Sequence, residues 1–202
     1  MGRWEPDAAG RLRSAALELF LERGYEQTTV ADIAERAGVT ARTFFRHFAD
    51  KREVLFAGGG ELEAHVVAAL ESVPASTPPL TAAARALEAA ADLLVDREFS
   101  RRRQVVIAAN AELRERELVK LAAWSSSLAE GLRRRGVADP AAGLAAETAV
   151  ALFRVAFERW VAAGERAGLA ELVRDSLSEL TQLTRGARLT RRTAAPRPAA
   201  PR

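Results

Sequence analysis

The sequence predicts an all-α fold, and three of its features support that prediction. Helix-forming alanine, leucine, glutamate and arginine dominate its 202 residues. Few stretches alternate strictly between apolar and polar residues, as half-buried strands do. Capping residues and glycines mark several helix ends, as at Thr29 and Gly38. We therefore expect about nine helices.

The first predicted helix follows a loose arm, residues 1–10, which carries Trp4. It spans Arg11–Arg23 and ends at Gly24, because glycine readily leaves the helical conformation. One face of this helix is apolar and indicates a packed core. Its stripe consists of Leu12, Ala15, Ala16, Leu19 and Phe20.

A helix-turn-helix is predicted in the run TTVADIAERAGVTARTFFRHF, residues 28–48. Thr29 and Asp32 form a capping-box-like pair at the start of a helix spanning Val30–Ala37, and Gly38 allows the tight turn. Thr40 caps a second helix, whose exposed N-terminus is where a recognition helix meets base edges. A tight helical hairpin without DNA binding is the alternative. In the second helix Phe44 and Phe48 share the buried face, and Arg42, Phe45 and Arg46 project from the other side.

A fourth helix is expected from Lys51, since Asp50 is a suitable N-cap and Glu53 stands at the capping-box position. The N-terminus of such a helix is a ready anion site. The glycine run at residues 58–60 interrupts this helix, which resumes from Glu61 to Ser72. The run is either a hinge between the two halves of the chain or a simple break, and glycine also permits close packing.

Five further helices are expected downstream. The first starts at Leu80 or Thr81 and ends at Val95. The other four span Phe99–Asn110, Ala111–Arg135, Ala141–Ala163 and Leu169–Leu183. Asp139 and Pro140 serve as cap and first residue of the fourth of these. In the third, Leu113, Leu118, Leu121, Trp124 and Leu128 are expected to point inward. The three arginines at 101–103 form either a solvated face or a second nucleic-acid patch.

The last two helices have more apolar surface than one small core can cover, which indicates a homodimer interface of two helices from each subunit. Its predicted residues are Leu152, Val155, Leu172, Val173, Leu177 and Leu180. From residue 185 the chain has six arginines and no acid, so residues 185–202 are expected to be a disordered basic tail. Without those six charges the net charge of +3 becomes −3 for residues 1–184.

Enzymatic chemistry has little support in this sequence. The absence of cysteine excludes disulfides, thiolate nucleophiles and sulfur-ligated metal sites. Only His47 and His65 are present, and no metal-ligand spacing, phosphate loop or nucleophile motif occurs. We therefore predict no catalytic residue, no metal and no cofactor. No signal peptide or membrane span is evident, which favours a cytoplasmic protein without a membrane partner.

Residues Leu12 to Leu55 resemble the DNA-binding domain of the TetR family of bacterial regulators, through Gly24-Tyr25, the TTV and DIA runs, AGV, HF and Lys51. The sequence departs from the family at Arg42, where glycine is frequent, and at Phe45, where tyrosine is usual; the missing hydroxyl removes one phosphate contact. The resemblance implies a DNA-binding domain at 1–56 and a ligand-binding and dimerisation domain at 57–184. It implies DNA contacts at Thr29, Thr40, Ala41, Arg42, Thr43, Phe45, Arg46, His47 and Lys51.

The segment from Glu112 to Gly164 is similar to the regulatory domains of actinobacterial TetR members that look like acyl-CoA-binding regulators. That similarity implies a small apolar, acyl-CoA-like effector. Its cavity wall is expected to include Trp124, Phe153, Phe157 and Trp160, whose alternative role is plain core. The predicted function is a repressor that binds a palindromic double-stranded operator as a homodimer and is released by the effector. A helical adaptor that binds only protein is the alternative.

Overall fold

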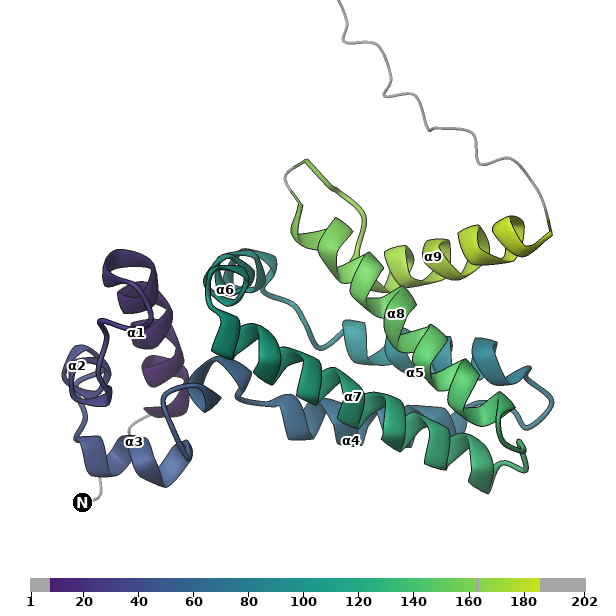
Figure 1. The fold of residues 1–202 in the computed structure, drawn as a ribbon, viewed down its shortest axis with the longest axis horizontal. Helices are drawn as coiled ribbons and strands as arrows, with labels where there is room; N and C mark the ends of the chain where they lie inside the picture. Colours follow the sequence, from purple (N-terminus) through teal and green to yellow (C-terminus); the bar gives the residue numbers. More distant parts are fainter. Residues whose placement is uncertain (1–7, 163, 186–202) are drawn as a thin grey trace, which may run out of the picture.

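The computed structural model describes residues 8–162 and 164–185, and every regular element in these ranges is helical (Figure 1). This confirms the predicted all-α class. The predicted arm with Trp4 and the basic tail lie outside the described residues, except for residues 8–10, which begin the first helix, and residue 185. The elements are α1 (Ala8–Arg23), α2 (Val30–Arg36), α3 (Ala41–His47), a 3₁₀ turn η1 (Glu53–Phe56), α4 (Gly59–Ser72), α5 (Pro79–Ala91), α6 (Arg97–Ala109), α7 (Ala111–Arg134), α8 (Ala141–Val161) and α9 (Leu169–Thr184).

The helix-turn-helix forms as its capping residues predict. The Thr29 hydroxyl accepts from the Asp32 amide at 3.1 Å, and the Thr29 amide donates to the Asp32 carboxylate at 2.8 Å, which completes a capping box. Thr40 caps α3 by accepting from the Thr43 amide at 3.2 Å. Between the two helices Gly38 has a φ of 68°, a conformation that favours glycine. Local hydrogen bonds therefore set the angle between α2 and α3.

The core around α1, α2, α3 and η1 is completed by residues from far along the chain. Val106 and Ile107 of α6 and Leu113 of α7 join the same buried cluster as Leu12, Phe44 and their neighbours, and Ile107 is 0% exposed. Three short helices bury too little apolar surface by themselves. The first 56 residues thus share their core with α6, although the sequence places a domain boundary at residue 56.

The second core lies between α4, α5, α7, α8 and α9, with α4 and α7 packed along each other (Figure 1). Alanines of α5 are buried there, which lets the neighbouring helices approach closely. Leu118 was expected to face inward, but it is 57% exposed. It lies about 140° around α7 from the buried Leu113, so the two side chains cannot share a face. No helix in the described ranges is long and apolar enough to span a membrane.

The α-helix predicted from Lys51 does not form. Instead, the Asp50 carboxylate accepts from the amides of Arg52 and Glu53, at 2.8 and 3.1 Å, and the single 3₁₀ turn η1 follows. Residues 54–56 of η1 are all buried.

Of the glycine run, only Gly58 lies between η1 and α4, and Gly59 and Gly60 are the first two residues of α4. Gly58 has a φ of 80° in the left-handed region, and α4 begins directly after it at Gly59. A Cβ at Gly60 would meet nothing within 4 Å, and one at Gly59 would meet only Lys120 at 3.8 Å. The run therefore marks a break before α4, and close packing does not explain it; its role as a hinge stays a prediction.

Two boundaries further along also differ from expectation. α5 ends at Ala91, so Leu93 and Val95 lie in an exposed connection. At the start of α8, Pro140 occupies the cap position, one residue later than expected. The Asp139 carboxylate pairs with Arg133 of α7 at 2.8 Å, and it also interacts with the backbone amide of Gly143 in the first turn of α8.

Replacing Ile107 by alanine should destabilise the helix-turn-helix (residues 29–48), although Ile107 lies 107 − 48 = 59 positions beyond its last residue. We expect a loss of about 2–5 kcal/mol of unfolding free energy, because a fully buried side chain is removed from a close-packed core. Urea unfolding measures the loss, and hydrogen exchange shows whether α1–α3 become less protected. Val105→Ala, on the exposed side of the same helix, is the matched control and should change stability by less than about 0.5 kcal/mol. Equal losses for both variants would contradict this shared core.

Candidate nucleic-acid interface

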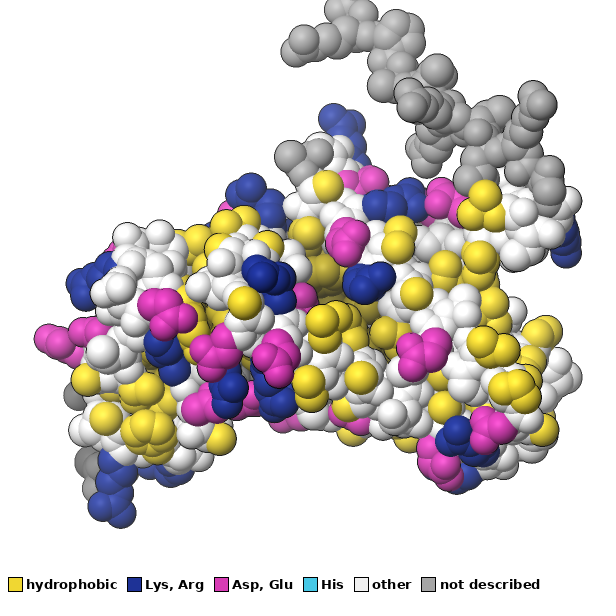
Figure 2. Space-filling model, in the orientation of Figure 1, with side chains coloured by type: hydrophobic (Ala, Val, Ile, Leu, Met, Phe, Trp, Pro, Cys, Tyr) yellow, Lys and Arg dark blue, Asp and Glu magenta, His cyan; other side chains and the backbone are white. Residues whose placement is uncertain are grey.

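α3 presents a basic and aromatic face to solvent. Phe44 is fully buried, and its ring contacts the rings of Phe45 and Phe48 at 5.5 and 5.3 Å between centroids. On the opposite side Arg42, Phe45 and Arg46 are exposed, as predicted. Lys and Arg side chains gather at this end of the molecule (Figure 2). The buried Phe44 thus fixes one face of α3 in the core, and Arg42 and Arg46 make the opposite face cationic.

No acidic residue lies within 4.0 Å of Arg42, a property that it shares with Arg46 on the same helix and with several other arginines in the described part of the chain. By contrast, Arg36 pairs with Glu18 and Glu22, and Arg52 pairs with Asp50. A guanidinium with all its donors available suits bidentate recognition of an acceptor pair, such as the O6 and N7 of guanine. Arg42 is therefore well placed for the base contact predicted from the sequence.

Phe45 is 58% exposed and has no hydroxyl, so it cannot hydrogen-bond a phosphate. In the major groove the apolar group available to such a ring is the C5 methyl of thymine. The predicted contact of this ring with DNA is therefore of a different kind from those of the arginines beside it, and it stays a prediction.

The threonines named as DNA contacts have internal partners. The Thr29 hydroxyl donates to Asp32 at 2.6 Å, and the hydroxyls of Thr40 and Thr43 lie 3.1 Å apart. Only one O–H of the Thr40–Thr43 pair remains free to donate outward. These side chains shape the ends of the two helices, and their contacts with phosphate remain predictions.

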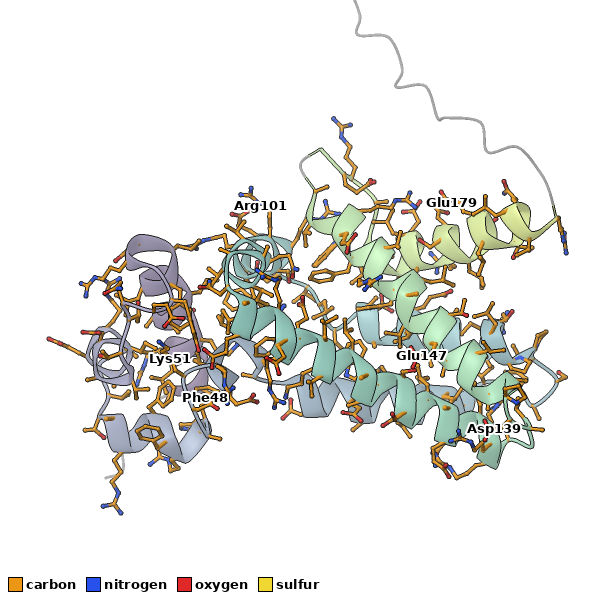
Figure 3. The ribbon with its side chains drawn as sticks, in the orientation of Figure 1. Phe48, Lys51, Arg101, Asp139, Glu147 and Glu179 are labelled. Carbon is orange, nitrogen blue, oxygen red and sulfur yellow. The ribbon has the colours of Figure 1, made fainter. Side chains whose placement is uncertain are left out.

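Lys51 has a structural task that the sequence did not reveal. Its ammonium donates to the carbonyls of Tyr25 and Thr28 at 2.8 and 3.1 Å and lies 4.0 Å from the Tyr25 ring centroid. It therefore holds the connection between α1 and α2, near Phe48 in Figure 3. Two of its three N–H groups are used, so at most one remains for a phosphate.

The anion site predicted at the start of the fourth helix is not formed, because Asp50 already occupies the amides of Arg52 and Glu53. His47 is exposed, with one ring nitrogen 3.5 Å from the Arg46 guanidinium. A histidine on this surface is not a core residue. Its role as a phosphate ligand stays a prediction.

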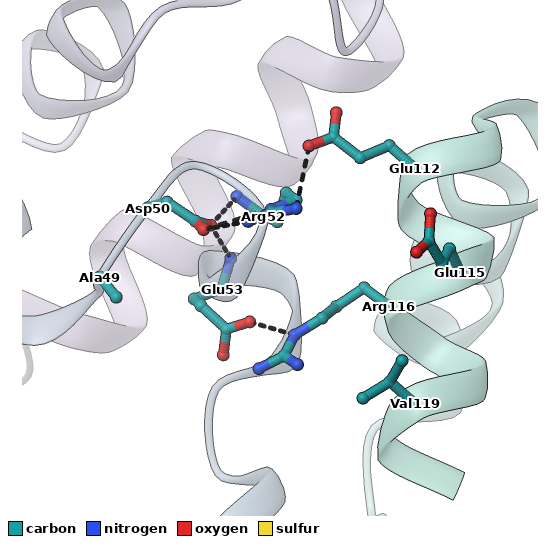
Figure 4. A pocket seen from close by; sticks show the side chains of 8 residues that line it. All are labelled: Ala49, Asp50, Arg52, Glu53, Glu112, Glu115, Arg116 and Val119. Atoms are coloured by element: carbon teal, nitrogen blue, oxygen red, sulfur yellow. Dashed lines mark hydrogen bonds and ion pairs between the residues drawn. The ribbon is translucent and has the colours of Figure 1, made fainter. Parts of the chain in front are cut away.

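Charged side chains of η1 and α7 join the helix-turn-helix to the rest of the molecule and line a surface pocket (Figure 4). Glu53 pairs with Arg116 and, at 3.3 Å, with Lys120, and Arg52 pairs with Glu112 at 3.3 Å. Below them Arg103 of α6 donates to the Leu55 carbonyl at 2.7 Å. Of the three arginines at 101–103, Arg101 pairs with Glu98 and Arg103 is turned inward, which disfavours a second nucleic-acid patch.

The four aromatic residues predicted to line an effector cavity do lie together. Trp124 contacts Phe153 at 5.4 Å between ring centroids, Phe153 contacts Phe157 at 6.3 Å, and Phe157 contacts Trp160 at 5.7 Å. Phe157 is half-buried and the other three are buried. They form one continuous row across α7 and α8, and their role towards a ligand remains a prediction.

Two of the residues predicted at a dimer interface are buried within the protomer. Leu172 and Val173 of α9 belong to the second core, so they are not available to a partner. Leu152, Leu177 and Leu180 are half-buried, and Val155 is 44% exposed. Leu144 is 65% exposed and lies eleven residues before Val155, three turns along the same face of α8. An apolar stripe thus remains uncovered on α8.

Comparisons with known families match both halves of the chain. Residues 12–57 match the family described as bacterial regulatory proteins of the tetR family. Residues 77–185, more than half of the chain, match the family described as the MftR C-terminal domain.

Individual relatives give the same assignment. The HTH-type transcriptional regulator TcmR of Streptomyces glaucescens is 48% identical over 84 residues, which are 42% of this chain and 37% of TcmR, so the match spans well under half of that protein. The putative mycofactocin biosynthesis transcriptional regulator MftR of Mycobacterium tuberculosis is 28% identical over 80% of this chain and 83% of its own. FadR of Bacillus subtilis, solved in complex with stearoyl-CoA, superimposes with a TM-score of 0.59 at 21% identity over 85% of this chain and 96% of its own, which shows a shared fold.

Replacing Glu53 by glutamine should weaken the junction in a pH-dependent way. Partial burial raises the pKa of the Glu53 carboxyl, but Arg116 and Lys120 outweigh it and hold the pKa below its ordinary value. A carboxyl with a lowered folded-state pKa stabilises above its unfolded-state pKa of about 4.3, and this contribution is lost as the pH falls through the folded value. We therefore expect Glu53→Gln to cost on the order of 1–2 kcal/mol at neutral pH, with the difference from wild type shrinking below about pH 4.3.

Urea unfolding at a series of pH values measures this effect. Glu98→Gln is the control, because its pair with Arg101 is exposed and screened by solvent, and it should matter far less. A difference between Glu53→Gln and wild type that stays constant down to about pH 3 would show that the ion pairs do not stabilise this junction.

Proposed function

This chain belongs to the TetR family of DNA-binding transcriptional regulators, and we propose that it is a repressor that binds a palindromic operator as a homodimer and is released by a small apolar effector. The observation that carries the proposal is the exposed face of α3, with the unpaired Arg42 beside Phe45 and Arg46 above the buried Phe44. Few surfaces other than nucleic acid satisfy two arginines and a ring on one short helix.

The homodimer follows from the size of the recognition element. α3 has seven residues and reaches only a few base pairs, so useful specificity requires a second copy. The partly exposed stripe on α8, with Leu144, Leu152 and Val155, and the half-buried Leu177 and Leu180 of α9 supply a surface for it. Pairing of two identical surfaces gives two-fold symmetry, which a palindromic operator matches.

The effector is proposed to reach the aromatic row from Trp124 to Trp160. An apolar ligand gains free energy from burial against such rings. FadR of Bacillus subtilis, which shares this fold, was solved with stearoyl-CoA. Long-chain acyl-CoA esters are therefore the first class of effector to test.

The function is tested by selecting bound sequences from random double-stranded DNA and measuring affinity for the selected operator, with and without stearoyl-CoA. Arg42→Ala should cost about 1–3 kcal/mol on the operator and relax the preference at one base pair, because it removes a bidentate base contact. Arg46→Ala, proposed as a phosphate contact, should weaken binding to all sequences alike and reduce the salt dependence by about one charge. Lys51 is unsuitable for this comparison, since it holds the α1–α2 connection.

Equal loss of affinity for operator and random DNA in Arg42→Ala would assign Arg42 to the phosphate backbone. If no sequence is enriched by the wild-type chain, the proposal of an operator-binding repressor is wrong. Operator binding that stearoyl-CoA leaves unchanged would reject that effector class and leave the DNA-binding proposal intact.

The dimer surface is tested by Val155→Glu, which places a charge in the exposed stripe of α8. We expect a shift from dimer to monomer at micromolar concentration and a matching loss of operator affinity, because an unpaired charge is costly to bury. Sedimentation or light scattering measures the shift. Val105→Glu, on the exposed side of α6, is the matched control and should remain a dimer. A wild-type chain that binds the operator fully as a monomer would refute the dimer proposal.

A further inference from the structure

Arg97, the first residue of α6, forms hydrogen bonds to the connection between α8 and α9. Its two terminal nitrogens donate to the main-chain carbonyls of Glu165 and Ala167, and its guanidinium carbon lies 5.3 Å from the centroid of the Trp160 ring. One side chain therefore contacts the end of α8 and the segment before α9. The planar fork of arginine makes two such hydrogen bonds from separate nitrogens in a fixed geometry, whereas lysine must donate both from a single nitrogen.

The segment that Arg97 contacts, residues 165–167, also has local hydrogen bonds of its own. The Glu165 carboxylate accepts from the amides of Arg166 and Ala167 at 2.7 and 2.8 Å, and these bonds lower the pKa of Glu165. The Arg166 amide belongs to the same peptide group as the Glu165 carbonyl, so the carboxylate fixes one of the two carbonyls that Arg97 contacts. A shift of this segment cannot occur without either moving Arg97 or breaking both of its hydrogen bonds.

The other end of α6 is fixed in the core of the helix-turn-helix. Val106 and Ile107 are buried against α1, and Arg103 donates to the Leu55 carbonyl with its guanidinium 4.8 Å from the Phe56 ring centroid. α6 has thirteen residues, a helix about 20 Å long, and lies between α1 and the end of α8 (Figure 1). A short helix held at both ends moves as one body.

We propose that Arg97 is a positioning residue that couples the α8–α9 segment to the DNA-binding helices through α6. The coupling makes the packing of α1–α3 depend on the arrangement of α8 and α9, the two helices assigned to the dimer surface. An effect of this coupling on DNA binding rests on the proposed function, namely that the chain binds an operator. The mechanical coupling itself is a property of the chain without DNA or effector.

Hydrogen exchange followed by mass spectrometry on the full chain, without ligand, tests the coupling. In Arg97→Gln we expect faster exchange in residues 164–168 and, beyond them, a rise on the order of tenfold in the protected amides of α1–α3, since two charge-assisted hydrogen bonds are lost. α4 should stay as protected as in wild type. Arg97→Lys should give an intermediate effect. Arg101→Gln is the matched control, one turn further along α6 and paired only with Glu98, and should resemble wild type.

Faster exchange confined to residues 160–170, with α1–α3 unchanged, would overturn the proposal, because Arg97 would then serve the α8–α9 segment alone. A uniform rise that includes α4 would also overturn it, since it would report general loss of stability. These outcomes are independent of whether the chain recognises a specific operator.

A second measurement uses only the wild-type chain and covers the case in which the Arg97 variants do not fold. Coupling is reciprocal, so binding of the selected operator should slow exchange in residues 164–168, far from the DNA. Operator binding that protects α1–α3 and leaves this segment unchanged would overturn the proposal. Failure to find any operator would count against the proposed function, while the exchange pattern of Arg97→Gln would still decide the coupling.

Discussion

The structure depends on the burial of Ile107 among the side chains of the helix-turn-helix. Three short helices and a 3₁₀ turn cannot cover their own apolar surface, and α6 supplies the missing part. The presented face of α3 is therefore stable only while α6 stays in place. This makes the DNA-binding half a tertiary structure of residues 8–57 together with parts of α6 and α7, in spite of the continuous family match at residues 12–57.

Features whose causes are local could be predicted from the sequence. The capping box at Thr29, the cap at Thr40 and the turn at Gly38 each require only neighbours within a few residues. Features set by distant contacts could not. Lys51 matched the family pattern, yet its two carbonyl partners belong to a connection more than twenty residues earlier. The Arg116 and Lys120 pair on α7 carried a weak signal, because the four-residue spacing places two cations on one face.

Periodicity also has a physical limit that explains the errors in the predicted dimer surface. A helical stripe shows that residues share a face, but it does not show whether that face meets the protomer's own core or a partner. Leu172 and Val173 turned out to face the core, whereas Leu144 and Val155 of α8 do not. The surplus of apolar residues was correctly recognised, and its division between the two surfaces needed the packing of α9 on α5 and α8.

Two routes join the DNA-binding half to the rest of the chain, and they differ in stiffness. The covalent route passes through Gly58, where a left-handed backbone without a side chain offers no packing contact. The other route passes through α6, where buried aliphatic side chains and the arginines at positions 97 and 103 fix both ends. Ion pairs such as Glu53 with Arg116 add to the second route, but each is partly solvated and individually modest. The position of α1–α3 on the rest of the chain is thus set chiefly by the packing of α1 on α6.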